Sequence, residues 1–139
     1  MSAKNIYHDT VVHALEADGW TITHDPMTLS YGDRDLYMDL GAERTAIAAE
    51  KGEQKIAVEI QSFLNPSAVR DLQEAVGQFE IYRAVLEERE PARTPYLAVP
   101  RRVYKGLLSE PLGKLIVDRL QLRLLVFDEK GEKVLQWIS

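Results

Sequence analysis

The sequence contains no cysteine among its 139 residues. This absence excludes a disulfide-bonded scaffold, a cysteine-ligated zinc site and a thiol nucleophile. The sequence also lacks an apolar run of the roughly 20 residues that a membrane span requires. Its opening residues, Met1-Ser2-Ala3-Lys4-Asn5, do not resemble a secretory signal. We therefore expect a globular, cytoplasmic protein with no membrane partner.

Positive charge is scarce: 17 lysines and arginines face 22 aspartates and glutamates, for a net charge of −5. Non-specific binding to phosphates requires clustered positive charge, so a surface that adheres to nucleic acid everywhere is excluded. DNA contact would require a local basic patch. The best candidate is Arg101, Arg102 and Lys105 at the start of a predicted short helix. The alternative is that these three residues form an ordinary solvated helix face.

The order of predicted helices and strands favours one α/β (α+β) domain over residues 1–139, with a central mixed β-sheet flanked by helices. The sequence has no repeat and no flexible linker. Hydrophobic spacing predicts two long helices, with Asn65 and Pro66 starting the second one, whose apolar stripe is Val69, Leu72, Val76, Phe79 and Leu86. The long helices are expected over 3–18 and 67–88, and short helices over 101–109 and 111–119. Strands are expected over 20–23, 36–40, 45–50, 55–61, 96–99, 122–127 and 133–138, with a turn at 51–54.

Two acids and one amide are the candidate functional residues. Alternation in the strand over 36–40 places Asp39 opposite three aliphatic residues, while Glu59 and Gln61 share one face of a later strand. If these strands are neighbours, both carboxylates face one pocket. Mg²⁺ binds through one or two carboxylates and can activate water for attack on a phosphodiester. The alternative is a pair of solvent-facing acids on a half-exposed sheet.

Longer segments of the chain resemble the XisH family, the fdxN-element excision controlling factors of cyanobacteria, over nearly the whole length. The segments that carry the resemblance are DGWTITHDP at 18–26, DLGAER at 39–44, AAEKG at 48–52, KIAVEIQSF at 55–63, YLAVP at 96–100, SEP at 109–111 and VLQWI at 134–138. The resemblance implies a restriction-endonuclease-like fold of the PD-(D/E)xK nuclease superfamily. It also implies a role in site-specific excision of a DNA element, together with a recombinase and a small companion protein, XisI.

Within that superfamily pattern, Asp39 and Glu59 match the two acids that hold Mg²⁺. Gln61 stands where lysine is usual, and Gln78 and Tyr82 look like the Gln-x-x-x-Tyr element that supports the site and contacts DNA. Glutamine keeps a hydrogen-bond donor but loses the positive charge beside the scissile phosphate. The loss of one such stabilising group typically costs about 10²–10³ in rate.

Three functions remain open at this point. The first is a controlling factor on a nuclease-like fold with attenuated or absent cleavage, and the second is an active Mg²⁺-dependent DNA endonuclease. The third is a non-catalytic protein-interaction module. Lys51 or Lys55 could replace the missing lysine, and His8 could join the metal site, although a histidine at the edge of the core is the simpler interpretation.

The strand over 122–127 is apolar on both faces. A strand of this kind must be covered by its own helices or by another chain, so a homo-oligomer contact and ordinary burial are equal alternatives.

Overall fold

The computed structural model describes residues 5–45 and 53–139. Its centre is a six-stranded sheet with the order β1-β4-β5-β6-β7-β8, and a separate two-stranded ribbon, β2-β3, lies beside it. The pairs β5-β6 and β6-β7 are parallel, and the other neighbours in the sheet are antiparallel. The strands are β1 Thr21–His24, β2 Met27–Tyr31, β3 Arg34–Met38, β4 Leu40–Thr45, β5 Glu53–Ile60, β6 Arg93–Pro100, β7 Leu124–Asp128 and β8 Lys133–Ile138.

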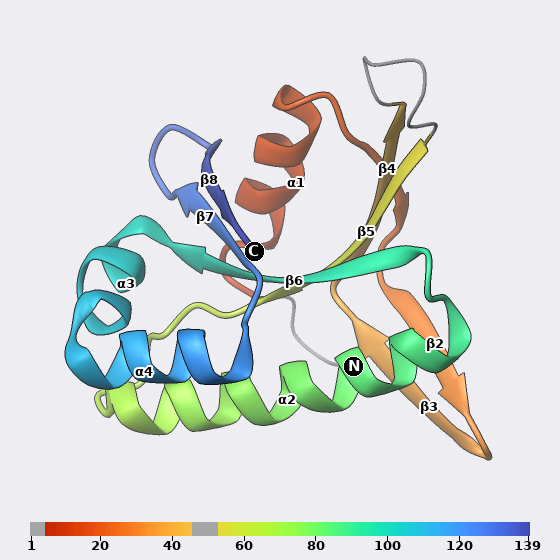
Figure 1. Ribbon diagram of the computed structural model, residues 1–139. Helices are drawn as coiled ribbons and strands as arrows, with labels where there is room; N and C mark the ends of the chain where they lie inside the picture. Colours follow the sequence, from red (N-terminus) through yellow and green to blue (C-terminus); the bar gives the residue numbers. More distant parts are fainter. Residues whose placement is uncertain (1–4, 46–52) are drawn as a thin grey trace.

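Helices cover both faces of the sheet (Figure 1). One face is covered by α1, and the other by the long helix α2 together with α3, a 3₁₀ turn and α4. The helices are α1 His8–Ala17, α2 Ala68–Arg89, α3 Arg101–Lys105, the 3₁₀ turn Leu107–Ser109 and α4 Pro111–Leu120. The predicted mixed sheet flanked by helices is confirmed, and it is consistent with a restriction-endonuclease-like arrangement.

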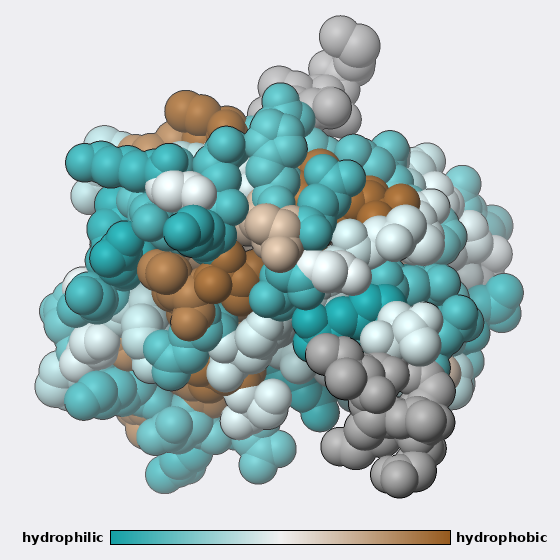
Figure 2. All heavy atoms as spheres, turned by 90° about the horizontal axis from the view of Figure 1, so that it is seen from above, coloured by the Kyte–Doolittle hydropathy of each residue, from teal (hydrophilic) through white to brown (hydrophobic). Residues whose placement is uncertain are grey.

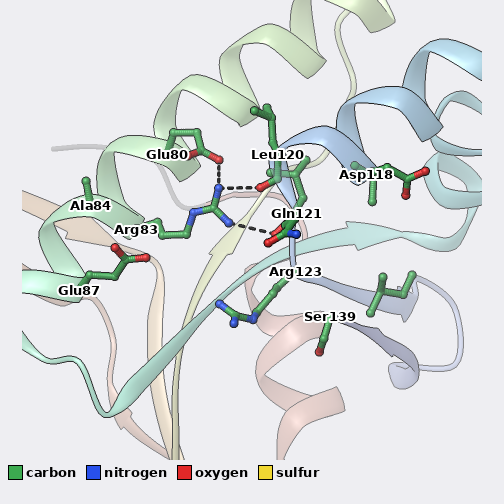
Figure 3. Close-up of a pocket in the computed structure, with 12 residues that line it drawn as sticks. Glu80, Arg83, Ala84, Glu87, Asp118, Leu120, Gln121, Arg123 and Ser139 are labelled. Atoms are coloured by element: carbon green, nitrogen blue, oxygen red, sulfur yellow. Dashed lines mark hydrogen bonds and ion pairs between the residues drawn. The ribbon is translucent and has the colours of Figure 1, made fainter.

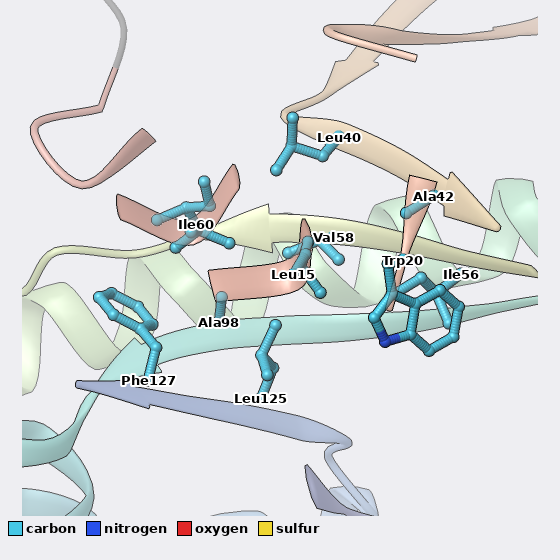
Figure 4. Close-up of a cluster of buried hydrophobic side chains, with 11 residues drawn as sticks. Leu15, Trp20, Leu40, Ala42, Ile56, Val58, Ile60, Ala98, Leu125 and Phe127 are labelled. Atoms are coloured by element: carbon cyan, nitrogen blue, oxygen red, sulfur yellow. The ribbon is translucent and has the colours of Figure 1, made fainter. Parts of the chain in front are cut away.

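The central strand β5 divides its side chains between the two layers. Ile56, Val58 and Ile60 pack into the cluster beneath α1 (Figure 4). Ala57 packs on the opposite side with Leu86 of α2. Because side chains alternate along a strand, Glu59 also faces α2. The predicted alternation in this strand is therefore confirmed, and it determines which helix lies over the candidate acid.

The prediction of a single strand over 36–40 is wrong. Met38 ends β3, which pairs with β2 in the ribbon, whereas Leu40 begins β4, which pairs with β5 in the main sheet. Asp39 is the bend between them. Strand β2 was not predicted. Of the strand expected over 45–50, Thr45 is the last residue of β4 and residues 46–50 lie outside the described residues. In the turn expected at 51–54, residues 53 and 54 instead begin β5, and residues 51 and 52 are not described.

Helix α2 starts at Ala68, one residue later than predicted. The Ser67 hydroxyl caps it by accepting the N–H of Arg70, while Asn65 Oδ1 accepts the N–H of Ser67. Val69, expected in the apolar stripe, is 45% exposed, and the first buried residue of the helix is Leu72. The described part of α1 likewise begins at His8 rather than at residue 3.

Strand β7 is buried on both faces within the chain. Leu124 and Val126 pack under α2 and α4, while Leu125 and Phe127 pack under α1. Of the two alternatives for this strand, ordinary burial accounts for its apolar character, so it does not require a second chain.

The described helices include none that combines the length and the apolar character needed to cross a bilayer. Seen from above, the molecule presents a mainly hydrophilic surface with separate apolar patches (Figure 2). This agrees with the high content of charged residues in the sequence.

Candidate functional site

Asp39 and Glu59 lie side by side where β4 begins and β5 ends. The antiparallel register of these strands places Leu40 opposite Val58, so the residue before Leu40 lies next to the residue after Val58. The N–H of Asp39 donates to Glu59 Oε1 at 3.3 Å, and the N–H of Ile60 donates to Asp39 Oδ2 at 2.7 Å. Two acids that are 20 residues apart in sequence thus form one carboxylate pair.

Within the described residues, no ion pair compensates the negative charge that Asp39 and Glu59 would carry when both are ionised. Glu59 is only 7% exposed, whereas Asp39 is half-buried. Burial, followed by the negative charge of Asp39, raises the pKa of Glu59 to about 9. Among the ion pairs of residues 5–45 and 53–139, none joins a basic side chain to either acid. A cation placed here would therefore offset both the burial and the repulsion.

Tyr82 of α2 faces the same acids. Its pKa is raised, first by burial and then by the negative charges of Glu59 and Asp39. The Tyr82 side chain is half-buried in the layer that holds Leu86 and the ribbon β2-β3. The phenol therefore stays protonated at neutral pH and can donate a hydrogen bond near the carboxylate pair.

Gln61 is held by Gln78. The Gln61 side-chain amide donates to Gln78 Oε1 at 2.7 Å, and the Gln61 backbone N–H donates to Ala98 O at 3.0 Å. The second bond extends the β5-β6 pairing one residue beyond Ile60, which fixes the direction of the Gln61 side chain. Gln78 and Tyr82 are one helical turn apart on α2. Together with Asp39, Glu59 and Gln61, they gather at one end of β5.

The donor set suits a hard cation with few protein ligands. No group of three or more histidines or acids close enough to hold a metal occurs in the described part of the chain. Zinc sites normally use at least three protein ligands. Mg²⁺ binds through one or two carboxylates and keeps several waters. A buried acid beside a half-buried one fits Mg²⁺, which needs only one or two carboxylates from the protein.

Two further side chains considered from the sequence lie away from the pair. Lys55 stands four residues before Glu59 on β5, in register with Glu43 and Arg93, and Lys51 lies outside the described residues. His8 is buried in α1, with Nε2 2.7 Å from Asp25 Oδ1 at angles that do not make a hydrogen bond. The contact made by His8 is thus with Asp25.

The predicted basic patch is partly neutralised by acids that the sequence did not reveal. Arg101 pairs with Asp128 at 3.1 Å, and Arg102 lies 3.9 Å from Glu129. These contacts arise because β6 and β7 are parallel, which brings Asp128 beside the start of α3. With Lys105 and Lys130, these four residues line a cavity of about 260 Å³. The patch keeps an excess of positive charge, but a smaller one than the sequence suggested.

Arg102 also connects the patch to the carboxylate end of β5. Its guanidinium donates to the carbonyl oxygens of Ser62 and Phe63, the two residues after Gln61. Phe63 has a φ of 54°, in the left-handed region that is costly for a residue with a side chain. Arg102 therefore stabilises the strained turn that follows the site. The carbonyl of Ile60 is likewise bonded, by the side-chain amide of Asn5 at 3.2 Å, a contact that the sequence did not signal.

A larger cavity, of about 690 Å³, lies elsewhere, between α2 and the ends of α4 and β8 (Figure 3). There Arg83 donates to the carbonyls of Leu120 and Gln121 and pairs with Glu80. These carbonyls end α4, so Arg83 caps that helix. Neither Asp39 nor Glu59 lines this cavity.

Comparisons with known proteins place the chain in a family. The model of the XisH family, described as XisH protein, matches residues 1–135. A search of curated proteins finds no match. A crystal structure of an XisH family protein from Nostoc punctiforme PCC 73102 is similar, with 40% identity, a TM-score of 0.88, and coverage of 97% of this chain and 100% of that one. The structure of a fdxN element excision controlling factor protein from Anabaena variabilis has 42% identity and a TM-score of 0.88, and covers 98% of this chain and 100% of its own. The chain therefore belongs to the XisH family.

Proposed function

We propose that this chain is a controlling factor for the site-specific excision of a DNA element, built on a PD-(D/E)xK nuclease-like fold with attenuated or absent cleavage. Family membership and the name of the Anabaena variabilis neighbour support the role in excision. The observation that carries the nuclease-like part is the Asp39–Glu59 pair at the end of a central strand.

Asp39 and Glu59 are the residues that would hold Mg²⁺. When bound, the ion would activate water and neutralise charge on a phosphate. The N–H of Ile60 orients the Asp39 carboxylate, and the N–H of Asp39 orients that of Glu59. Tyr82, whose raised pKa keeps its phenol protonated, supplies a hydrogen-bond donor from α2. The chain thus pre-positions its acids with backbone groups, which do not move when charge develops.

We propose weak cleavage because Gln61 has a neutral side chain. The position after Ile60 carries a neutral amide, and that amide is already bonded to Gln78. A lysine there would bring a positive charge beside the scissile phosphate, and no ion pair of the described residues brings a basic group to either acid. The pair would bind an ion, but the cleavage rate would be about 10²–10³ lower than with lysine at position 61.

An active Mg²⁺-dependent endonuclease is the second candidate function. The observation in its favour is that both acids are present and adjacent, with Glu59 buried and its pKa raised. Raised acid pKa values of this kind cluster at functional sites. We propose the same partners in either case: DNA, through the patch at Arg101, Arg102 and Lys105, and, as the family resemblance implies, a recombinase and an XisI-like companion protein.

An excision reporter separates the two candidates. Cells that carry the element, the recombinase and the companion protein, but lack this chain, are supplied with the wild type or with Asp39→Asn. Asparagine keeps the oxygen that accepts the N–H of Ile60, so the fold is retained. If the chain is a controlling factor that does not need to cleave DNA, both proteins restore excision. If only the wild type restores excision, the endonuclease is supported. If neither protein restores excision, both functions are excluded.

A further inference from the structure

We propose that the free edge of β2 binds an extended, basic segment of a partner protein, which adds a third strand to the ribbon β2-β3. This ribbon points away from the six-stranded sheet, beside the C-terminal end of α2 (Figure 1). It is a two-stranded sheet of its own, so within the described residues β2 has a neighbouring strand on one side only. The unpaired backbone groups of such an edge can pair with a strand of another chain.

A cavity of about 270 Å³ borders this edge. It is lined by Thr28, Leu29 and Ser30 of β2, and by Arg89 and Glu90 at the end of α2. Side chains alternate between the two faces of a strand, so three consecutive residues line one space where that space borders the strand's edge. The lining includes no residue of β3. The cavity therefore lies along the edge of β2 that faces away from β3.

The backbone of β2 has hydrogen-bonding groups free at that edge. Its residues pair with β3 in regular register, from Met27 opposite Met38 to Tyr31 opposite Arg34. Within residues 5–45 and 53–139, no backbone–backbone hydrogen bond outside the helices and paired strands involves β2. In an antiparallel pair only alternate residues bond to the neighbouring strand. The N–H and C=O groups of the other residues of β2 therefore point towards the open edge.

The two edge strands of the main sheet are less suited to pairing. The register of β1 shifts between Ile22 and His24, and that of β8 shifts opposite Val126 and Phe127. Irregularities of this kind twist an edge strand and hinder the addition of another strand. The register of β2 contains no such shift. Of these three strands, β2 is therefore the one that offers a regular edge.

The surroundings of the edge indicate the chemistry of the partner. Segments 33–35 and 87–90, at the tip of the ribbon and the end of α2, contain five acids and two arginines. A basic segment complements this charge. On the inner face of β2, Met27 and Leu29 pack with Leu86, whereas Thr28 and Ser30 on the outer face are exposed. An added strand that alternates apolar and basic residues matches both faces.

A second copy of this chain fits the edge less well. Antiparallel pairing of β2 with itself, over all five residues, is centred on Leu29. In that register Asp25 of each copy lies next to Asp33 of the other. Like charges at neighbouring positions of two strands destabilise the pair, so the charges favour a different, basic chain.

This inference goes beyond the proposed function, because it requires neither the carboxylate pair nor DNA. Asp39→Asn, which removes a proposed metal ligand, is expected to leave the binding of a basic strand unchanged. A failure of the metal site and a failure of the β2 edge are thus distinguishable.

A labelled peptide of alternating lysine and valine is a direct probe of the edge. In fluorescence anisotropy we expect saturable binding with a Kd below about 1 mM, at least about tenfold tighter than that of an alternating glutamate and valine peptide. The lysine and valine peptide with every backbone nitrogen methylated keeps its side chains and charge but loses its N–H donors. It is expected to bind at least about tenfold more weakly. The proposal is overturned if the first peptide does not saturate, or if the methylated peptide binds equally well.

Two lysine substitutions assign the binding to β2. Ser30→Lys places a positive charge on this edge strand, and Asp35, which now accepts the Ser30 hydroxyl at 2.6 Å, remains as its partner. We expect it to weaken binding of the lysine and valine peptide at least about tenfold, as should Thr28→Lys on the same face. The matched control is Leu135→Lys, which adds the same charge at an exposed position of the edge strand β8. Equal losses in Ser30→Lys and Leu135→Lys, or no loss in either, would refute the site.

Sedimentation velocity tests the choice of partner. We expect the wild type to sediment as a monomer at micromolar concentrations, with Ser30→Lys indistinguishable from it. A wild-type dimer that Ser30→Lys dissociates would overturn the proposal, because a second copy would then occupy the edge.

Discussion

Asp39 and Glu59 are held side by side by each other's strand: Glu59 Oε1 accepts the N–H of Asp39 at 3.3 Å, and Asp39 Oδ2 accepts the N–H of Ile60 at 2.7 Å. Each carboxylate therefore has one oxygen satisfied by the backbone, and the remaining oxygens carry the pair's negative charge. Burial, followed by the negative charge of Asp39, raises the pKa of Glu59 although the Glu59 side chain accepts a hydrogen bond.

The first prediction concerns stability and pH in metal-free buffer. The folded-state pKa of Glu59 is about 9, above the value of 4.5 for an exposed glutamate. The folded protein therefore holds a proton that the unfolded chain releases. The contribution of Glu59 to the free energy of unfolding is fully present below about pH 4.5 and is lost as the pH rises towards 9. Glu59→Gln removes this ionisation, and we expect it to raise the free energy of unfolding at pH 8 by about 1–3 kcal/mol.

Urea denaturation of the wild type and of Glu59→Gln at pH 5 and pH 8, with EDTA present, measures this effect. The gain from glutamine should be clear at pH 8 and much smaller at pH 5. A gain of the same size at both pH values would mean that the Glu59 charge is not what limits stability.

The second prediction concerns Mg²⁺. An ion at the pair favours the ionised form of Glu59 and binds the folded chain alone, so it should raise the melting temperature at pH 8. At ten times its dissociation constant, the ion is expected to add about 1.4 kcal/mol. Asp39→Asn should lose this response, and sodium chloride at matched ionic strength should not reproduce it. Equal shifts in the wild type and in Asp39→Asn would place the ion elsewhere.

The third prediction concerns DNA. Weak binding that falls steeply with salt should depend on the patch that includes Arg101, Arg102 and Lys105, and reversing all three charges should abolish it. Because Arg102 also anchors the Ser62–Phe63 turn, Lys105→Glu is the cleaner variant. It should lower the slope of log affinity against log salt by about one. Lys114→Glu on α4 is the matched control, and an equal effect there would show that only net charge matters.

The sequence predicts the strand alternation around Glu59 because burial on one face imposes a period of two. It does not predict the bend at Asp39. Leu36, Met38 and Leu40 continue the same alternation, and all three are partly or fully buried. Met38, however, pairs with Met27 in the ribbon, whereas Leu40 pairs with Val58 in the main sheet. A period-two pattern is the same in one strand or two, so only tertiary pairing reveals the break.

The resemblance to the PD-(D/E)xK pattern singles out Asp39, Glu59, Gln61, Gln78 and Tyr82 in the sequence, and their roles stay a prediction. The neutralisation of the basic patch could not be predicted. Asp128 and Glu129 are far along the chain from Arg101 and Arg102, and they meet only through the parallel register in which Pro100 lies opposite Phe127. Local charge spacing carries no signal of such a contact.

The fourth prediction, and the most direct test of the account, is Mg²⁺-dependent nicking of supercoiled plasmid DNA by the wild type and by Gln61→Lys. We propose that cleavage is weak because the Gln61 side chain, a neutral amide bonded to Gln78, replaces a lysine at the carboxylate pair. We therefore expect little or no nicking by the wild type and a gain of about one to three orders of magnitude with lysine. Adding Asp39→Asn to Gln61→Lys should remove that gain while leaving the circular dichroism spectrum unchanged. Robust Mg²⁺-dependent nicking by the wild type, abolished by Asp39→Asn, would contradict the account and make Gln61 a competent active-site residue.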